Sequence, residues 1–169
     1  MSKLAKQKAA EVFNRLGGTI PIDLRKAARV YKLKIEKKEM DDSVSGMLVI
    51  DKNKAIIVVN GKQSKTRQRF TIAHEIGHYI LHKEPDAVFV DNVNILYRSK
   101  NSPNTGKEID ANIFAATLLM PESAIRQEVD QIKSNIFDED MARALANKFK
   151  VSSQALTYRV LNLGLYTHS

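Results

Sequence analysis

The chain contains no cysteine among its 169 residues. This absence excludes a disulfide framework, a thiol nucleophile and a thiolate-bound zinc site. Every protein ligand of a metal ion must therefore be histidine, aspartate or glutamate. Long apolar runs are also missing, since none approaches the roughly 20 residues that a membrane-spanning helix needs. The lysine-rich residues 1–10 lack the apolar core of a signal peptide, so we expect a soluble, cytoplasmic protein.

The size and charge of the chain set further bounds. With 43% hydrophobic residues, the chain can bury one good core and suits one domain with a small helical appendage. The net charge of +8 invites nucleic acid as a partner. The basic residues form no dense block, so a solvated basic surface is the simpler interpretation. An acidic protein substrate, or a substrate that sits near DNA, is the alternative.

Apolar periodicity predicts two helices at the start of the chain. One runs from Ser2 to Leu16, and a second has Pro21 in its first turn with Leu24 and Tyr31 on its buried face. Three short segments then have strand patterns: 33–36, 46–50 and 55–59. The last two are joined by a short turn and predict an antiparallel hairpin. Further short strands are expected at 87–90 and 95–97. This order of elements predicts an α+β fold with a small antiparallel sheet.

His74, Glu75 and His78 form the pattern H-E-x-x-H. On a helix, histidines four residues apart stand on one face and can reach a single divalent ion, while the glutamate flanks that ion as a base. The helix is predicted from its apolar periodicity, with Ser64 as N-cap and an end at residues 81–83. The two histidines are also compatible with ordinary helix residues, so a third ligand is needed.

A candidate third ligand lies in a predicted helix of residues 107–120 that Pro121 closes. Glu108 stands where the buried face of this helix begins, and a carboxylate there would complete the His₂Glu set of catalytic zinc sites. Asn112, one turn later, is placed to hydrogen-bond the back of a ligand imidazole and fix its tautomer. Taken alone, Glu108 is also explained as a solvated acid in the first turn of a helix.

Two distant motifs occur in a fixed order in this chain. They are Arg69–His78 and Glu108-x-x-Ala111-Asn112-x-Phe114-Ala115-Ala116-x-Leu118-Leu119-Met120-Pro121. Together they resemble the ImmA/IrrE family of metallopeptidases, and residues 20–24 and 45–46 are similar to that family as well. The resemblance implies a compact, zincin-like peptidase with the sheet packed against the metal helix. It also implies a helix-turn-helix repressor as substrate, whose cleavage relieves transcription in mobile elements or stress responses.

Carried over residue by residue, the resemblance assigns His74, His78 and Glu108 as metal ligands and Glu75 as the general base. This ligand set favours Zn²⁺, although Mn²⁺ or another divalent ion is compatible with it. The base would accept the proton of the attacking water and pass it to the leaving amine.

Three further residues have possible roles near this site. Tyr79 and Tyr97 are candidates for stabilising the oxyanion. His82 continues the histidine series by another helical turn, but it would lie about 12 Å along the axis from His74, too far for both to bind one ion. We therefore interpret His82 as a capping residue or as a hydrogen-bond partner of a ligand.

We expect residues 1–125 to form the peptidase domain and residues 126–169 a helical extension packed on it. Two apolar stripes in the extension flank a turn at 151–153 and resemble a helix-turn-helix. This leaves an alternative function, a DNA-binding transcriptional regulator with a structural or sensory metal site. The second helix of the pair offers Arg159 as its single cation, so a structural pair is the better interpretation.

Overall fold

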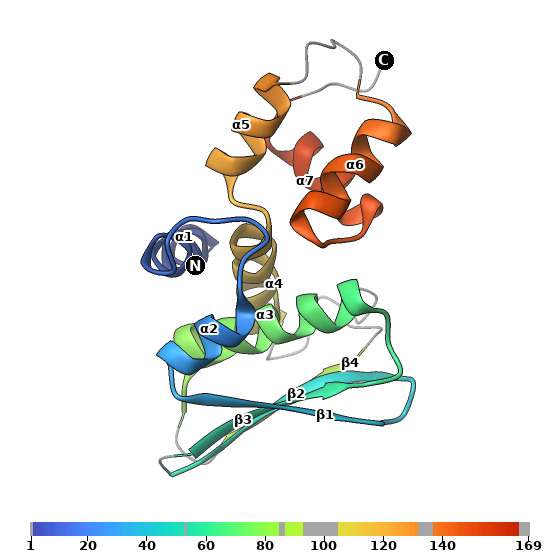
Figure 1. Cartoon of the computed structure of the whole chain (residues 1–169). Helices are drawn as coiled ribbons and strands as arrows, with labels where there is room; N and C mark the ends of the chain where they lie inside the picture. The colour runs from blue at the N-terminus through green and yellow to red at the C-terminus, as the bar shows by residue number, and fades with distance from the viewer. Residues whose placement is uncertain (1, 53, 85–86, 93–104, 132–136, 166–169) are drawn as a thin grey trace.

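The structure is a computed structural model, and Figure 1 shows a small sheet at one end with helices stacked on it. It describes residues 2–52, 54–84, 87–92, 105–131 and 137–165. The strand expected at residues 95–97 lies outside these ranges. Within the described residues the elements follow in this order: α1 Ser2–Arg15, α2 Leu24–Val30, β1 Leu33–Lys38, β2 Val44–Asp51, β3 Lys54–Asn60, α3 Lys65–His82, β4 Val88–Asn92, α4 Thr105–Leu119, α5 Glu122–Gln131, α6 Glu139–Phe149 and α7 Ser153–Asn162.

The sheet has the strand order β1-β3-β2-β4. The predicted hairpin is confirmed, because β2 and β3 pair antiparallel, and β4 pairs antiparallel with β2. The prediction of an antiparallel sheet is wrong for β1, which pairs parallel with β3. The reason is that β3 folds back between the two strands that precede it in sequence. The fold is therefore α+β with a mixed sheet.

Asn60, at the end of β3, holds this insertion in place. Its side chain is fully buried and its Nδ2 donates to the carbonyls of Asp41 and Val44, at 3.1 and 2.8 Å. Its Oδ1 accepts from the backbone N–H groups of Met40 and Lys62. A single buried amide thus ties the exposed connection between β1 and β2 to the end of β3.

The start of α2 differs from the prediction. The helix begins at Leu24 rather than near Pro21, because the side chain of Asp23 accepts a hydrogen bond from the backbone N–H of Lys26 and caps it. Pro21 lies before the cap. Helix α1 ends at Arg15, one residue before the predicted end, and is followed by Gly17 and Gly18 with φ of 100° and 64°, a conformation that glycine adopts at low cost.

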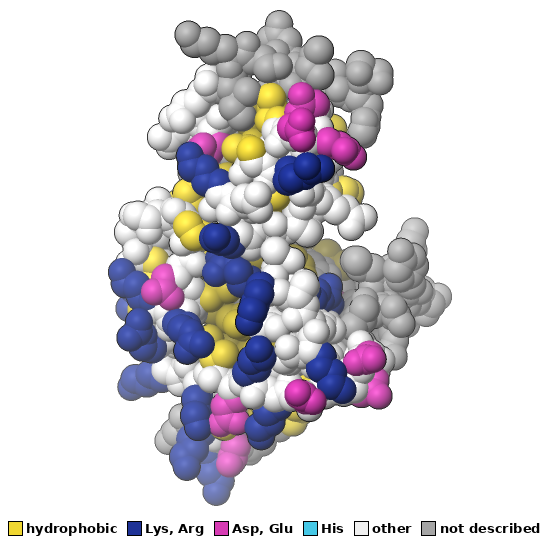
Figure 2. All heavy atoms as spheres, turned by 45° about the vertical axis from the view of Figure 1, so that its right-hand side comes forward, with side chains coloured by type: hydrophobic (Ala, Val, Ile, Leu, Met, Phe, Trp, Pro, Cys, Tyr) yellow, Lys and Arg dark blue, Asp and Glu magenta, His cyan; other side chains and the backbone are white. Residues whose placement is uncertain are grey.

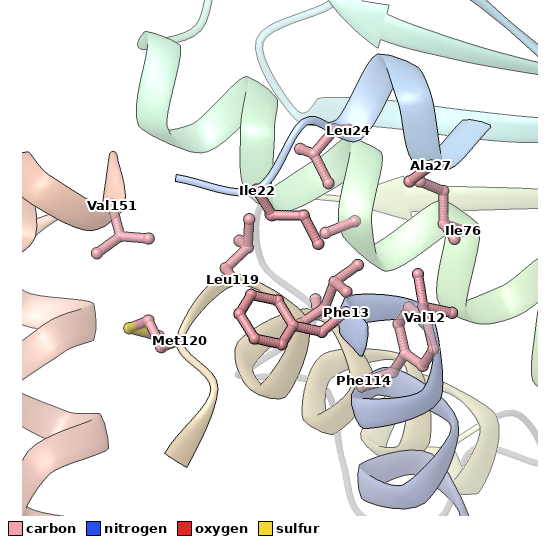
Figure 3. Packing of buried hydrophobic residues seen from close by; sticks show 14 of the residues in the cluster. Val12, Phe13, Ile22, Leu24, Ala27, Ile76, Phe114, Leu119, Met120 and Val151 are labelled. Carbon is pink, nitrogen blue, oxygen red and sulfur yellow. The ribbon is translucent and has the colours of Figure 1, made fainter. Parts of the chain in front are cut away.

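One hydrophobic core joins α1, α2, α3 and α4. Figure 3 shows Val12 and Phe13 of α1, Ile76 of α3 and Phe114 of α4 converging there. The close approach of α3 to α4 depends on Gly77, because a Cβ at this position would lie 3.0 Å from Cδ1 of Phe114. This contact brings the middle of α3 against α4.

Helices α6 and α7 form the predicted pair at the other end of the molecule (Figure 1). Asp138 and Ser152 cap the two helices, and Lys150 ends α6 with a φ of 57°. The guanidinium of Arg159 in α7 donates from Nε to the carbonyl of Met120, 3.1 Å away, and so ties the pair to the end of α4. Among the described helices, none is long and apolar enough to cross a membrane.

Candidate metal centre

Helix α3 carries His74, Glu75 and His78. Ser64 caps it as predicted, because its Oγ accepts from the backbone N–H of Arg67 at 3.2 Å. All three functional candidates are buried, with exposed fractions of 1%, 0% and 1%. Three ionisable side chains on one buried helix face are costly unless they have polar partners or bind a cation.

Glu108 meets the two histidines. Its Oε2 lies 3.3 Å from Nε2 of His74, and its Oε1 lies 3.3 Å from Nε2 of His78. The two Nε2 atoms are themselves 2.9 Å apart. One donor atom from each of the three residues lies within 4.8 Å of the others. Helix α4 therefore brings together residues that are 30 and 34 positions apart in sequence.

Asn112 lies behind His74. The Nδ1–H of His74 donates to Oδ1 of Asn112 at 3.0 Å. This bond puts the ring proton on Nδ1 and leaves the Nε2 lone pair directed at Glu108 and His78. The predicted hydrogen bond to the back of this imidazole is present, and its partner Asn112 comes from the same helix as Glu108.

Burial and neighbouring charges shift the pKa values of the site residues in different directions. The pKa of Glu75 is raised well above its ordinary value by burial and by the nearby carboxylates of Asp91 and Glu108. Burial also lowers the pKa of His78, which favours the neutral, metal-binding form. Burial acts to raise the pKa of Glu108, but its interactions with His74 and His78 outweigh burial and lower that pKa to about 2.

Asp91 of β4 also belongs to this region, and sequence reasoning missed it. It is 5% exposed, and its carboxylate groups with donor atoms of His74 and Glu75 within 4.8 Å. Its Oδ2 accepts from Oγ1 of Thr71 at 3.4 Å and lies 3.6 Å from Nη2 of Arg67. The available sequence signal was a carboxylate in a short apolar strand. Such a group is buried only when it has polar partners, so it indicates a buried polar site.

The neighbouring Phe89 completes this wall of the site. Its ring stacks on the imidazole of His78, with centroids 4.8 Å apart and planes inclined by 22°. Alternation along β4 thus points Phe89 and Asp91 at α3, while Val88 and Val90 are 61% and 42% exposed.

The remaining candidates are Tyr79, Tyr97 and His82. The Tyr79 hydroxyl accepts an exposed hydrogen bond from Nζ of Lys83 at 3.1 Å, and Tyr97 lies outside the described residues. The role of both tyrosines stays a prediction. The ring of His82 lies tilted beside that of His78, with centroids 5.9 Å apart, and His82 is absent from the metal-binding groups found among the described residues.

The donor set fits a divalent transition ion. Two imidazole nitrogens and one carboxylate are the His₂Glu ligands of catalytic zinc sites. Both carboxylate oxygens of Glu75, and Oε2 of Glu108, are buried without a hydrogen-bond partner in the described part of the chain. Clustered carboxylates without donors repel one another, and a cation beside them relieves that repulsion.

Comparison with known proteins also indicates a metallopeptidase. The profile of the family described as IrrE N-terminal-like domain, Peptidase_M78, matches residues 28–161. The chain is 25% identical over 167 residues to the protein called Metallopeptidase ImmA of Bacillus subtilis, covering 99% of this chain and 90% of that protein.

Two further relatives match over shorter stretches. The Radiation response metalloprotease IrrE of Deinococcus radiodurans is 33% identical over 76 residues, which is 45% of this chain and 22% of that protein. The Uncharacterized immunity region protein 2 of Bacillus phage phi105 is 29% identical over 84 residues, covering 50% of this chain and 49% of that one.

Proposed function

The chain belongs to the Peptidase_M78 family of ImmA/IrrE metallopeptidases, and we propose that it is a zinc-dependent endopeptidase whose substrate is a helix-turn-helix transcriptional repressor. The observation that carries this proposal is the meeting of His74, His78 and Glu108 beside the buried Glu75. The fold we propose is zincin-like, with the metal helix α3 lying on the sheet.

Each side chain has one task in the proposed reaction. His74, His78 and Glu108 hold the ion, and Asn112 keeps the His74 lone pair on Nε2. A bound divalent ion supplies Lewis acidity toward water and toward the scissile carbonyl.

Glu75 handles the proton in this scheme. Its carboxylate accepts a proton from the attacking water and donates it to the leaving amine as the peptide bond breaks. Without a cation, burial and the carboxylates of Asp91 and Glu108 raise the pKa of Glu75 and favour its protonated form. A divalent ion held by the three ligands would lower the pKa of Glu75 again and restore its carboxylate. Glu75 would therefore act as a base only in the metal-bound protein.

The edge strand β4 suits an extended substrate. In the described sheet β4 has β2 on one side only, and its residues Phe89 and Asp91 form a wall of the site. An extended peptide that adds to such an edge gains main-chain hydrogen bonds, which fix the scissile bond relative to Glu75.

A repressor as substrate is supported by the family and by one phage relative. The family resemblance implies cleavage of helix-turn-helix repressors, and the phi105 relative carries the name of an immunity region. Two parts are proposed for the chain, a peptidase domain at 1–125 and a helical extension at 126–169 that contacts it through Arg159 and Met120.

The alternative is a DNA-binding regulator that reads sequence with α7. Arg159 is the only cation of this helix, and its guanidinium is half-buried against the carbonyl of Met120. A reading helix needs exposed side chains that reach base edges. The packing of Arg159 therefore favours the structural role of the pair.

Substitution of the base tests the proposed function. Glu75→Gln keeps the side-chain volume and leaves His74, His78 and Glu108 free to hold the ion. Loss of a general base costs roughly 10²- to 10⁴-fold in rate. When a repressor partner is co-expressed, we expect wild type to give two fragments on a gel and Glu75→Gln to leave the repressor intact.

The control is metal content, measured on both purified proteins. Equal metal in wild type and Glu75→Gln shows that the loss is chemical rather than structural. Equal cleavage of the same repressor by both proteins would refute the role of Glu75. Sequence-selective DNA binding that needs α7 and no cleavage of any repressor would support the alternative.

A further inference from the structure

Positive charge is concentrated in the first part of the chain. Residues 1–69 contain 17 Lys or Arg and 7 Asp or Glu, whereas residues 70–169 contain 10 and 12. The whole positive excess of the protein is therefore carried by α1, α2, the β1–β3 strands and the first turn of α3. Figure 2 shows Lys and Arg side chains gathered over the lower and middle parts of the molecule, with few on the α5–α7 end.

The densest part of this charge follows α2 and the outer strand β1. We define the basic rim as seven exposed cations between residues 25 and 38: Arg25, Lys26, Arg29, Lys32, Lys34, Lys37 and Lys38. The only carboxylate within that span is Glu36, which pairs with Lys34 and Lys38 at 2.9 and 3.5 Å. Arg25, Arg29 and Lys37 form no ion pair with any described residue.

We propose that the basic rim binds the phosphate backbone of nucleic acid, independently of the peptidase site. Helix α2 packs beside β1, so the seven cations lie along the β1 edge of the molecule, with Lys37 on one face of the strand and Lys34 and Lys38 on the other. A strand of six residues is about 20 Å long, and one strand of B-DNA carries a phosphate about every 3.4 Å. The rim is therefore long enough to face several phosphates at once.

The composition of the rim favours a phosphate backbone over a protein partner. Protein interfaces are depleted in lysine and centred on aromatic or aliphatic side chains. The rim has four lysines and three arginines, and the large exposed apolar side chains of the described chain all lie outside it: Leu4, Val88, Val90, Ile109 and Tyr158. A membrane surface is also disfavoured, because a basic helix that binds lipid carries apolar side chains for insertion.

Protection of the β1 edge against pairing with another sheet explains only part of the basic rim. Lysines on an edge strand prevent unwanted pairing of sheets, and Lys34, Lys37 and Lys38 serve that end on β1. Arg25 and Arg29 lie on α2, where there is no strand edge to protect. Their unpaired charges are the part of the rim that such protection leaves unexplained.

The position of the rim lets both activities operate together. The strands β3 and β2 separate β1 from β4, which places the two outer strands about 14 Å apart at the usual strand spacing. Nucleic acid on the β1 side therefore leaves the β4 wall and the metal centre accessible. If the substrate is a DNA-bound repressor, the rim would raise the local concentration of enzyme near it.

The test compares two triple variants with the same change in charge. One neutralises the rim, Arg25→Gln/Arg29→Gln/Lys37→Gln, and the other neutralises the α6 end, Arg143→Gln/Lys148→Gln/Lys150→Gln. Binding of the full-length proteins to a labelled 30-base-pair duplex of arbitrary sequence is measured by fluorescence anisotropy between 50 and 200 mM NaCl. Circular dichroism melts and metal content establish that both variants fold.

We expect wild type to bind with a steep salt dependence and little sequence preference. Each lost phosphate contact lowers the slope of log K against log salt by about 0.9. The rim variant should therefore show a slope shallower by about 2 to 3 and an affinity at least roughly tenfold weaker at the lowest salt. The α6 variant should bind within about twofold of wild type.

Three outcomes overturn the proposal. In the first, wild type does not bind the duplex at 50 mM NaCl. In the second, the α6 variant loses as much affinity as the rim variant, which would move the contact to the helix pair. In the third, the rim variant loses binding to phosphatidylserine vesicles while duplex binding is unchanged, which would identify a lipid surface instead.

Discussion

The two outer strands of the sheet place ionisable side chains in opposite environments. On the β4 side, Asp91 is buried with His74 and Glu75 against α3. On the β1 side, Lys34 and Lys38 are 71% and 64% exposed and pair with Glu36 in solvent. Both arrangements occur on one four-stranded sheet.

The difference shows how burial decides what a charge does. Buried carboxylates without donors raise one another's pKa, and they make a site that gains strongly from a cation. Exposed lysines beside a carboxylate change little in stability, because water and salt screen the pair. Chemistry is therefore expected on the β4 side, and reversible electrostatic binding on the β1 side.

The largest effect is expected from removing a ligand on the β4 side. Glu108→Ala takes away one of the three donors, and we expect the purified protein to lose its stoichiometric divalent ion. Asp110→Ala is the matched control, because Asp110 is also a buried acid of α4 and is absent from the metal-binding groups of the described residues. Elemental analysis of both proteins decides; full retention of metal by Glu108→Ala would remove Glu108 from the ligand set.

A second prediction compares two glutamates in the chelated, metal-free protein. Burial, with Asp91 and Glu108, raises the pKa of Glu75 in the folded state. As pH rises above about 4.3, the unfolded chain ionises this group while the folded chain keeps the proton, so the free energy of unfolding falls. Glu75→Gln removes this loss, and its melting temperature should exceed that of wild type at pH 7 to 8. The difference should vanish below about pH 4.

Glu36 on β1 should behave in the opposite sense. Hydrogen bonding and charge from Lys34 lower its pKa, so ionised Glu36 favours the folded state above the ordinary glutamate pKa and loses that effect as pH falls. Glu36→Gln should leave the neutral-pH melting temperature unchanged or slightly lower. A rise for Glu36→Gln, or a fall for Glu75→Gln, would contradict the contrast between the two sides.

A third comparison between the two sides uses two glycines. A Cβ at Gly46 in β2 would lie 2.5 Å from Cγ2 of Thr71 and 2.7 Å from the carbonyl oxygen of Val58. The backbone carbonyl cannot move without shifting β3, so Gly46→Ala should cost about 1 to 3 kcal/mol of unfolding free energy. Because Thr71 precedes His74 on α3, metal affinity should fall as well.

Gly61 provides the control on the β1 side. An added Cβ at Gly61 would lie 2.7 Å from Cε and 3.2 Å from Cγ of Lys37, both in one flexible and exposed side chain. That side chain can turn away, so Gly61→Ala should change the free energy of unfolding by less than about 0.5 kcal/mol. Urea denaturation of both variants measures the two changes; equal costs would mean that the packing of α3 on β2 is looser than the contact at Thr71 indicates.

Helical spacing alone predicted which of the candidate residues share a helix face. His74 and His78 share a face because four residues make about one turn of helix, and Ser64 caps α3 as its side chain predicts. Glu108 and Asn112 share a face of α4 for the same reason, and the hairpin of β2 and β3 follows from its short turn. These are relations between residues close in sequence, where backbone geometry fixes the distances.

Tertiary packing decided the rest. The approach of Glu108 to the histidines depends on how closely α4 packs on α3, which Gly77 and Phe114 set. The parallel pairing of β1 arises because β3 inserts between β1 and β2. Asp91 enters the site because β4 pairs with β2 below α3. Each of these contacts joins segments far apart in sequence, and their distance depends on the packing of the whole core rather than on any local pattern.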